Sequence, residues 1–371
     1  MRVLHVLGRQ RWGLSLGLAP AIVRAQICRG DQVWVAARDG EVAERFRSLG
    51  ATVVRLPLWL RPGQPLDVVP LLYLYHLSKS ERFDLMVTHS FKSGLLGGLG
   101  ARMAGVPRIV HHSQGFRFQA MKGLRRRYYL ATEKVAAWAG DLIVTAWEEH
   151  RERALHAGVA PPERLITIRD GVAARPGRPS NSCREVAFAA SKRIIGCVGC
   201  LALEWGCACM LRAMPTVLAR HPEARLVIAC NGALEEQLRP EAALMGLGDR
   251  VVFLQTPGET LAAINRFDIF VDASLGTAPA APLLEAMSAG RAIVASNTQP
   301  HRELFEHGHT ALLVAPGSTR ALAEGVTTLL DNPRRALRLG AAAQLAVAKR
   351  FSFERAIAEI LTVYGAGRTA P

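Results

Sequence analysis

Short apolar runs of strand length alternate along this chain with longer segments whose apolar positions recur at helical spacing. Several of the runs are apolar throughout, which is typical of strands that helices cover on both faces. Strand–helix–strand repetition predicts right-handed crossovers and therefore parallel sheets. We expect strands at Val3–Leu7, Val33–Ala37, Thr52–Leu56, Leu85–Thr88, Arg108–His111, Leu142–Val144, Leu165–Ile168, Ile194–Val198, Arg225–Ala229, Val251–Leu254, Ile269–Asp272, Ala292–Ala295 and Ala311–Val314.

A break in this rhythm indicates two domains. Residues 171–185 are rich in Gly, Pro and Ser, and the alternation of strands and helices restarts after them. A chain of 371 residues also exceeds what one hydrophobic core usually fills. We therefore predict an α/β protein with two Rossmann-like, doubly wound domains, 1–170 and 186–350, and a helix at Phe351–Tyr364. Because ligands of such sheets bind at the carboxyl ends of the strands, we expect a cleft there.

The composition argues against several classes of protein. No apolar run approaches the roughly 20 residues of a membrane span, and we expect no signal peptide at the start. Seven cysteines, mostly inside apolar runs, fit a reduced, cytoplasmic protein.

A zinc site is one reading of four cysteines that lie close together in the sequence: Cys197, Cys200, Cys207 and Cys209. Zinc ligands usually lie in turns at CxxC spacing, whereas Cys197 lies within a predicted strand, so we expect no metal.

Positive charge is concentrated in the first half of the chain. Residues 1–185 carry a net charge of +13 and residues 186–371 a net charge of +2. The densest cluster is Lys122, Arg125, Arg126 and Arg127. This cluster is either a solvated helix face or a surface that attracts acidic lipid, a lipid-phosphate acceptor or nucleic acid. We expect no nucleic-acid partner, because the sequence has no zinc finger, RNA-binding aromatic motif or convincing helix-turn-helix.

Two candidate sites follow predicted strands in the first half. A glycine-rich segment, residues 8–17 with Gly13 inside it, follows the first strand, and such a turn into a helix can cradle phosphate. The glycines do not have GxGxxG spacing, so a nicotinamide dehydrogenase is not indicated.

The second candidate site lies where the fifth strand meets its loop, with His111, His112 and then Gln114. A histidine there is either a hydrogen-bonded strand-end residue or a base or phosphate donor.

A third candidate site lies in the second half. Residues 277–289 predict a loop that enters a helix, with Pro282 near its start and Gly290 as its C-terminal cap. Glu285 lies in the first turns of this helix and faces a cleft if its apolar neighbours face the core. A carboxylate there either binds two ribose hydroxyls or is a favourable charge near a helix N-terminus.

Several segments carry a resemblance to a known family: 3–13, 88–94, 104–107, 114–118, 168–172, 195–199, 283–295 and 350–353. Together they resemble the family-four glycosyltransferases of the GT-B fold, which are retaining and metal-independent and use nucleotide sugars. The resemblance covers nearly the whole chain, and the stretch 283–295 is its most specific part. It implies an acceptor-side domain at 1–170, a linker at 171–185, a nucleotide-sugar-side domain at 186–350, and a last helix within 351–371 that packs back on the first domain.

The same resemblance assigns site residues, several of which depart from the family pattern. Gly13 begins the turn where the family has Gly-Gly-x-Glu, and Gln114 stands where it has histidine. Cys200 and Trp205 stand where it has the arginine and the lysine that bind the diphosphate. Thr277 replaces the first glutamate of its paired-glutamate motif, and Glu285 retains the second. The candidate catalytic residues are Gln114 and Thr277, together with His112 from its place at the strand end, and the candidate donor-binding residues are Gly13, Gly199, Cys200, Trp205 and Glu285.

The function implied is glycosyl transfer from a nucleotide sugar to a lipid-linked or saccharide acceptor in cell-surface polysaccharide or lipopolysaccharide synthesis. No metal or other cofactor is expected. The protein is expected to be cytoplasmic and peripheral on the inner membrane face, with Lys122 and Arg125–Arg127 on the acceptor and membrane side. The alternative is a catalytically impaired relative that acts as a scaffold or partner subunit, since the cations that neutralise a leaving diphosphate are replaced.

Overall fold

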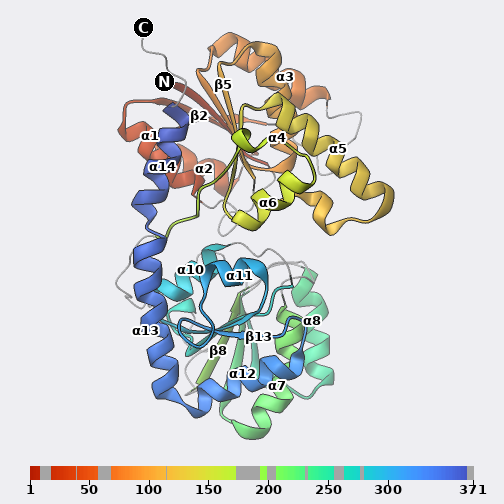
Figure 1. Cartoon of the computed structure of the whole chain (residues 1–371), viewed down its shortest axis with the longest axis vertical. Helices are drawn as coiled ribbons and strands as arrows, with labels where there is room; N and C mark the ends of the chain where they lie inside the picture. Colours follow the sequence, from red (N-terminus) through yellow and green to blue (C-terminus); the bar gives the residue numbers. More distant parts are fainter. Residues whose placement is uncertain are drawn as a thin grey trace. The chain divides into compact units, whose positions relative to one another are not determined.

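The chain forms two compact units (Figure 1). The first comprises Met1–Asp170 together with Glu354–Pro371, and the second comprises Gly171–Phe353. The computed structural model describes residues 1–8, 18–38, 40–56, 68–113, 115–172, 193–198, 206–229, 233–254, 263–275 and 280–365.

The first unit contains a seven-stranded parallel sheet with the strand order β3-β2-β1-β4-β5-β6-β7. Its strands are β1 (Arg2–Val6), β2 (Gln32–Ala37), β3 (Thr52–Arg55), β4 (Leu85–Thr88), β5 (Arg108–Ser113), β6 (Leu142–Thr145) and β7 (Leu165–Thr167). Its helices are α1 (Ala19–Cys28), α2 (Glu41–Ser48), α3 (Val68–Glu81), α4 (Phe91–Ala104), α5 (Gly123–Ala139), α6 (Glu148–His156) and α14 (Phe353–Gly365), with 3-10 turns η2 (Arg117–Ala120) and η3 (Pro162–Arg164).

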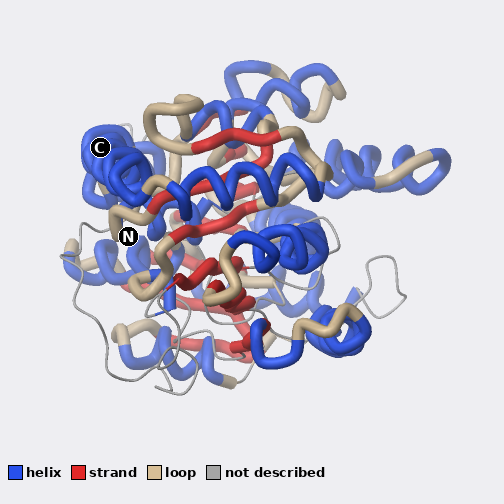
Figure 2. Tube along the Cα trace, turned by 90° about the horizontal axis from the view of Figure 1, so that it is seen from below, coloured by secondary structure: helices blue, strands red, loops and turns tan. Residues whose placement is uncertain are grey.

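Helices cover both faces of this sheet, because neighbouring strand residues point to opposite faces and both sets are apolar. In Figure 2 the strands, drawn in red, lie between blue helices. Val35 of β2 belongs to the apolar cluster that contains Phe46 of α2. Its neighbour Ala36 belongs to the cluster that contains Leu74 of α3.

The last helix, α14, packs in the first unit. Figure 1 shows it beside α1, and Ile360 of α14 lines the same cavity as Ile22 of α1. The guanidinium of Arg108 donates a hydrogen bond of 3.5 Å to the carbonyl of Val363. Helix α14 therefore forms part of the wall around the first sheet.

The second unit repeats this architecture with a six-stranded parallel sheet in the order β10-β9-β8-β11-β12-β13. Its strands are β8 (Arg193–Val198), β9 (Ala224–Ala229), β10 (Val251–Leu254), β11 (Ile269–Asp272), β12 (Ala292–Ser296) and β13 (Leu312–Val314). Its helices are α7 (Cys207–Arg220), α8 (Ala233–Leu244), α10 (Ala280–Ser288), α11 (Gln299–Leu304), α12 (Thr319–Asp331) and α13 (Pro333–Arg350), with a 3-10 turn η6 (Gly248–Arg250).

Each sheet has a switch point, where two neighbouring strands are followed by connections that leave in opposite directions. The strand orders place it between β1 and β4 in the first unit and between β8 and β11 in the second. A glycine lies close to the opposing chain at both points. A Cβ on Gly8 would lie 2.1 Å from Ser90 Oγ, and a Cβ on Gly206 would lie 2.0 Å from the carbonyl oxygen of Ala273.

The fold predicted from the sequence is confirmed, and every expected strand is present within two residues of its expected ends. The fifth strand extends beyond His111 and includes His112 and Ser113. Residues 306–309, a turn in the second unit, are exposed. Gly171 and Val172, the first residues of the expected linker, lie against the chain near Ser352, with which Val172 forms a β-bridge. The rest of the linker and residues 366–371 lie outside the described residues.

Substitution of Gly206 by alanine is expected to destabilise the second unit strongly. Gly206 has φ of +73°, which costs an L-residue about 1–2 kcal/mol, and its Cβ would also overlap the backbone of Ala273. We expect the free energy of unfolding to fall by at least about 3 kcal/mol in urea titrations. Gly246→Ala is the matched control, because Gly246 has φ of +67° and nothing lies within 4 Å of its Cβ position. Equal losses for both variants would show that the close approach is unimportant.

Candidate functional site

Three imidazole rings stack at the carboxyl edge of the first sheet, near its switch point. His5 comes from β1, His89 follows β4, and His112 lies near the end of β5. The rings of His5 and His89 have centroids 5.2 Å apart and planes inclined by 16°, and those of His89 and His112 are 5.4 Å apart and inclined by 25°. Three strand ends that are far apart in sequence thus place their imidazoles on one face of the sheet.

Hydrogen bonds hold this stack at both ends. His5 Nε2 lies 2.7 Å from Gln26 Oε1 in α1, and His5 Nδ1 lies 2.9 Å from His89 Nε2. A neutral imidazole has one donor and one acceptor nitrogen, so His5 donates to one of these two partners and accepts from the other. At the other end, His112 Nε2 lies 2.8 Å from the hydroxyl of Tyr364 in α14. The two helices beside the sheet therefore fix the orientation of the stack.

These histidines are neutral, because burial disfavours the imidazolium. Burial lowers the pKa of His5 from 6.5 to about 4, against the opposing effect of the Gln26 hydrogen bond. Burial, with the neighbouring histidines, lowers the pKa of His112 to about 3. The pKa of His89 is likewise held well below 6.5, by burial first and then by the adjacent rings. The stack offers hydrogen-bond donors and acceptors without net charge.

A small cavity of about 50 Å³ opens at this stack. Its wall contains His89, His112, Ser113, Asp170 after β7, and apolar side chains from α1, β6 and α14. Burial raises the pKa of Asp170 from 3.8 to about 6. The cavity therefore combines neutral imidazoles with a carboxyl group that takes up a proton in mildly acidic solution.

The structure separates the two neighbouring histidines that the sequence singled out. His112 lines the cavity. His111 points to the other face, where its Nδ1 lies 2.8 Å from Thr88 Oγ1 and a Cβ on Gly94 of α4 would lie 2.7 Å from its ring. His111 is thus a packed core histidine, whereas His112 is available for chemistry. Gln114 and Gly13 lie outside the described residues.

Glu285 lies at the corresponding edge of the second sheet. It is partly buried in α10, and its neighbours Leu283, Leu284 and Met287 are fully buried in the core. The apolar neighbours thus face the core, which is the condition under which the sequence places Glu285 towards a cleft. Thr277, Gly199, Cys200 and Trp205 lie outside the described residues.

A second buried carboxylate, Asp272, ends β11 in the same unit. Its Oδ2 lies 3.6 Å from His301 Nε2, and its Oδ1 accepts a hydrogen bond of 3.0 Å from the backbone N–H of Ser274. Burial alone would raise the pKa of Asp272, but the neighbouring His301 and the hydrogen bond from Ser274 outweigh it and lower the pKa below 3.8. This pair fixes the end of β11, directly before the segment that contains Thr277.

The described cysteines do not form a metal cluster. Cys197 in β8 and Cys207 at the start of α7 are buried, with their sulfur atoms 3.2 Å apart, and Cys209 Sγ lies 3.5 Å from Thr319 Oγ1. Among the residues that the structure describes, no three His, Cys, Asp or Glu side chains form a group with metal-ligand geometry. Both buried thiols belong to the apolar core of the second unit.

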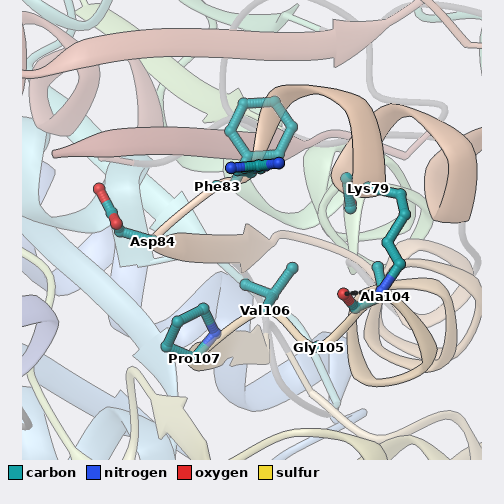
Figure 3. A pocket seen from close by; sticks show the side chains of 9 residues that line it. Lys79, Phe83, Asp84, Ala104, Gly105, Val106 and Pro107 are labelled. Carbon is teal, nitrogen blue, oxygen red and sulfur yellow. Dashed lines mark hydrogen bonds between the residues drawn. The ribbon is translucent and has the colours of Figure 1, made fainter.

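A larger hollow of about 560 Å³ lies at the opposite edge of the first sheet. Its wall includes Phe83 and Asp84, which precede β4, and Val106 and Pro107, which precede β5. Figure 3 shows Lys79 reaching towards Ala104, whose carbonyl oxygen accepts a hydrogen bond of 3.5 Å from Nζ. Ligands of doubly wound sheets bind at the other edge, so we do not assign this hollow to the site.

The basic cluster lies at the start of α5, on an exposed helix. Arg125, Arg126 and Arg127 are exposed. Four large apolar side chains of the same helix are exposed as well: Leu124 at 81%, Tyr128 at 45%, Val135 at 42% and Trp138 at 63%. Their spacings of four, seven and three residues place them on one side of the helix. This helix therefore presents an apolar stripe beside positive charge.

Sequence reasoning missed four members of the first-unit site: His5, His89, Asp170 and Tyr364. In the sequence, His5 is a single polar residue inside an apolar strand. Its place in the stack becomes visible only with His89 and Gln26, which are distant in the sequence. Asp170 follows a predicted strand, a position from which a side chain reaches the carboxyl edge. Tyr364 lies 252 residues from His112 and gives no local signal.

Family models match both units. A model described as "Glycosyl transferase 4-like domain" matches residues 19–171, and one described as "Glycosyl transferases group 1" matches residues 192–332. Together the two models cover most of the chain. The first covers β2 to β7 of the first sheet, and the second covers all six strands of the second sheet.

Curated relatives are glycosyltransferases. An Escherichia coli UDP-Gal:alpha-D-GlcNAc-diphosphoundecaprenol alpha-1,3-galactosyltransferase is 26% identical over 257 residues, which are 67% of this chain and 66% of that one. The putative glycosyltransferase EpsD of Bacillus subtilis is 24% identical over 324 residues, 84% of each chain. The lipopolysaccharide core mannosyltransferase LpcC of Rhizobium leguminosarum is 28% identical over 211 residues, 55% of each chain.

Solved structures share the fold. Anabaena HepE in complex with UDP and glucose has a TM-score of 0.81 at 18% identity, and the match covers 99% of this chain and 100% of that one. Sucrose-phosphate synthase from Thermosynechococcus elongatus has a TM-score of 0.79 at 19% identity, and the match covers 98% of both chains. At this level of identity the likeness concerns the fold.

Acidification is expected to destabilise the first unit between pH 6.5 and 4. The unfolded chain takes up protons at about pH 6.5, whereas folded His5 and His111 resist them down to about pH 4, so these two histidines lower the free energy of unfolding as the pH falls. Asp170, whose folded pKa is raised to about 6, offsets part of this loss. The loss is on the order of 3 kcal/mol per such histidine. Hydrogen exchange, corrected for the intrinsic rate, should show β1, β4 and β5 losing protection before β8 and β11. Equal loss in both units would contradict this assignment.

Proposed function

The chain belongs to the family-four glycosyltransferases with a GT-B fold, and we propose that it transfers a sugar from a nucleotide-sugar donor to a lipid-linked or saccharide acceptor in cell-surface polysaccharide synthesis. The observation that carries this proposal is the match of one family model to each unit. The relatives from E. coli, B. subtilis and R. leguminosarum support it, because each is named as a glycosyltransferase. They favour transfer over the scaffold alternative.

The donor is assigned to the carboxyl edge of the second sheet, and a uridine nucleotide is the class to test first. HepE, which shares the fold, was solved with UDP and with UDP-glucose, and the E. coli relative is named for UDP-galactose. Glu285 is the group proposed to bind the two ribose hydroxyls, since a carboxylate accepts both hydrogen bonds. The family resemblance further supports transfer without a metal ion.

Cys200 and Trp205 are proposed to lie against the diphosphate, with Gly13 and Gly199 leaving room for the phosphates. A thiol and an indole bind an anion without charge, which is weaker than the grip of an arginine and a lysine. Thr277 is proposed to contact the donor sugar through its hydroxyl, where the family has a carboxylate. These substitutions predict slow turnover and a weakly held nucleotide.

The acceptor is assigned to the carboxyl edge of the first sheet, where His112 lines the cavity, and Gln114 follows His112 by two residues in the sequence. The cavity of about 50 Å³ is too small for a sugar ring and admits a single hydroxyl or a water molecule. The proposal is therefore that one hydroxyl of the acceptor enters this cavity while the rest of the acceptor lies outside it. The E. coli relative is named for an acceptor that is a sugar on a lipid diphosphate.

A transfer assay tests the donor and acceptor assignments together. We expect product by mass spectrometry when UDP-glucose or UDP-galactose is mixed with diphosphate-linked N-acetylglucosamine on a short lipid, with or without a chelator. Glu285→Gln should weaken UDP binding about 10- to 100-fold in calorimetry, because it removes a charge-assisted pair of hydrogen bonds. Glu324→Gln is the control, since Glu324 is an exposed residue of α12 that pairs with Arg320. Unchanged UDP affinity in Glu285→Gln would remove Glu285 from the donor site.

We also propose that α5 holds the protein on an anionic membrane surface. The described residues contain no helix that is long and apolar enough to cross a membrane. An exposed helix with an apolar stripe and adjacent arginines is instead suited to lie in the plane of the interface. Each basic residue near an anionic surface contributes about 1 kcal/mol, screened beyond roughly 8 Å at physiological salt. A protein held in this way at the membrane surface would reach an acceptor that is anchored in the membrane by its lipid.

Vesicle sedimentation tests the role of α5. Reversal of Arg125, Arg126 and Arg127 to Glu should reduce binding to vesicles with phosphatidylglycerol by at least about 10-fold, because each contact contributes about 1 kcal/mol. The matched control reverses Arg334, Arg335 and Arg338 in α13, which changes the net charge equally in the other unit. Equal binding to neutral and anionic vesicles, or equal loss in the control, would contradict the proposal.

A further inference from the structure

The last helix holds one ring nitrogen of the cavity histidine. Tyr364 in α14 is 3% exposed, and its hydroxyl oxygen lies 2.8 Å from His112 Nε2. The two rings meet edge to face, with centroids 5.8 Å apart and planes at 84°. Since His112 also stacks on His89, its ring is fixed in both position and rotation.

The direction of this hydrogen bond determines where the His112 proton lies. Burial raises the pKa of the Tyr364 phenol well above 10 and lowers the pKa of His112 to about 3, so both groups are neutral. A neutral imidazole has one donor and one acceptor nitrogen. If Nε2 carried the proton, it would donate to the tyrosine oxygen, and the buried tyrosine O–H would then have no acceptor among the described residues, which costs about 1–3 kcal/mol. The hydroxyl therefore donates to Nε2, and the imidazole proton lies on Nδ1.

We propose that Tyr364 is a positioning residue that fixes His112 as the Nδ1–H tautomer, so that His112 donates a hydrogen bond to the acceptor hydroxyl in the cavity and does not act as a base. The proposal rests on the assignment of the acceptor to the first unit. It makes the acceptor site depend on a side chain at the far end of the sequence.

The other wall of the cavity completes the recognition of a hydroxyl. Asp170 lines the same cavity and, when ionised, accepts the hydroxyl hydrogen that His112 leaves free. A hydroxyl thus has both a donor and an acceptor, whereas a phosphate would also face the carboxylate of Asp170, which repels it. The cavity therefore favours an uncharged hydroxyl group over a phosphate.

Nitrogen NMR of histidine-labelled protein tests the tautomer without any substrate. In the wild type we expect His112 to show a protonated Nδ1 and an unprotonated Nε2 between about pH 5 and 8. Tyr364→Phe keeps the ring and removes the hydroxyl, so the two tautomers should become mixed. Thr362→Val is the matched control, because it removes an exposed hydroxyl from the same helix. A protonated Nε2 in the wild type, or an unchanged His112 signal in Tyr364→Phe, would overturn the proposal.

Two substitutions of His112 test the role of Nδ1 without changing the helix. His112→Asn places an amide N–H near the position of Nδ1, and His112→Gln places one near the position of Nε2. With the lipid-diphosphate N-acetylglucosamine as acceptor, we expect His112→Asn to bind it more tightly than His112→Gln. The reverse order would show that Nε2, and not Nδ1, meets the acceptor.

Kinetics separate this proposal from the proposed function. Tyr364→Phe should raise the KM for the acceptor about 5- to 10-fold, the equivalent of one neutral hydrogen bond, with the KM for the UDP-sugar unchanged. A change in both KM values would indicate a general structural defect and would contradict the positioning role. If the wild type transfers no sugar to this acceptor, the proposed acceptor is wrong. The NMR experiment needs no substrate, so it still decides which nitrogen of His112 carries the proton.

Discussion

The close approach of two chain segments at each switch point is the constraint on which both candidate sites depend. Gly8 lies against Ser90 in the first unit and Gly206 lies against Ala273 in the second, and a Cβ at either glycine would overlap the opposing chain. In the first unit this approach brings the end of β4 over β1. Ser90 also caps α4, with its Oγ accepting from Ser93 N. The chain before the cap is thereby fixed, and His89 is held within hydrogen-bond distance of His5.

Burial without charge then determines what the first site can do. Imidazoles in contact with one another and with apolar helices cannot all be protonated, so each is held by a neutral partner: Gln26, His89 or Tyr364. Such a site loses the ability to act as a strong base near neutral pH and gains fixed hydrogen-bond directions. A retaining transferase, whose acceptor must be oriented on one face of the donor sugar, benefits from direction more than from basicity.

The sequence predicts the strands, the two sheets and the core-facing register of the apolar neighbours of Glu285, because apolar periodicity depends only on local spacing. It cannot choose between His111 and His112. Alternation shows that they face opposite sides of the sheet, but the side that borders the cavity is defined by α14, whose sequence lies far away. On α5 the spacing of apolar residues does not correspond to burial. Leu124 and Trp138 recur at helical spacing, which usually indicates burial, and yet both are exposed.

Charge is distributed within the first unit in a way that separates two parts of an acceptor. The unit is strongly basic overall and carries its densest arginine cluster on the exposed start of α5. Its cavity, by contrast, contains neutral imidazoles and the carboxyl group of Asp170. The arginines stabilise a phosphate at the basic surface, whereas the carboxylate of Asp170 repels a phosphate in the cavity. A hydroxyl needs one donor and one acceptor, and the cavity offers both. A lipid-linked sugar carries both groups, so this unit has the electrostatic features to orient it with the phosphate outside and a sugar hydroxyl inside.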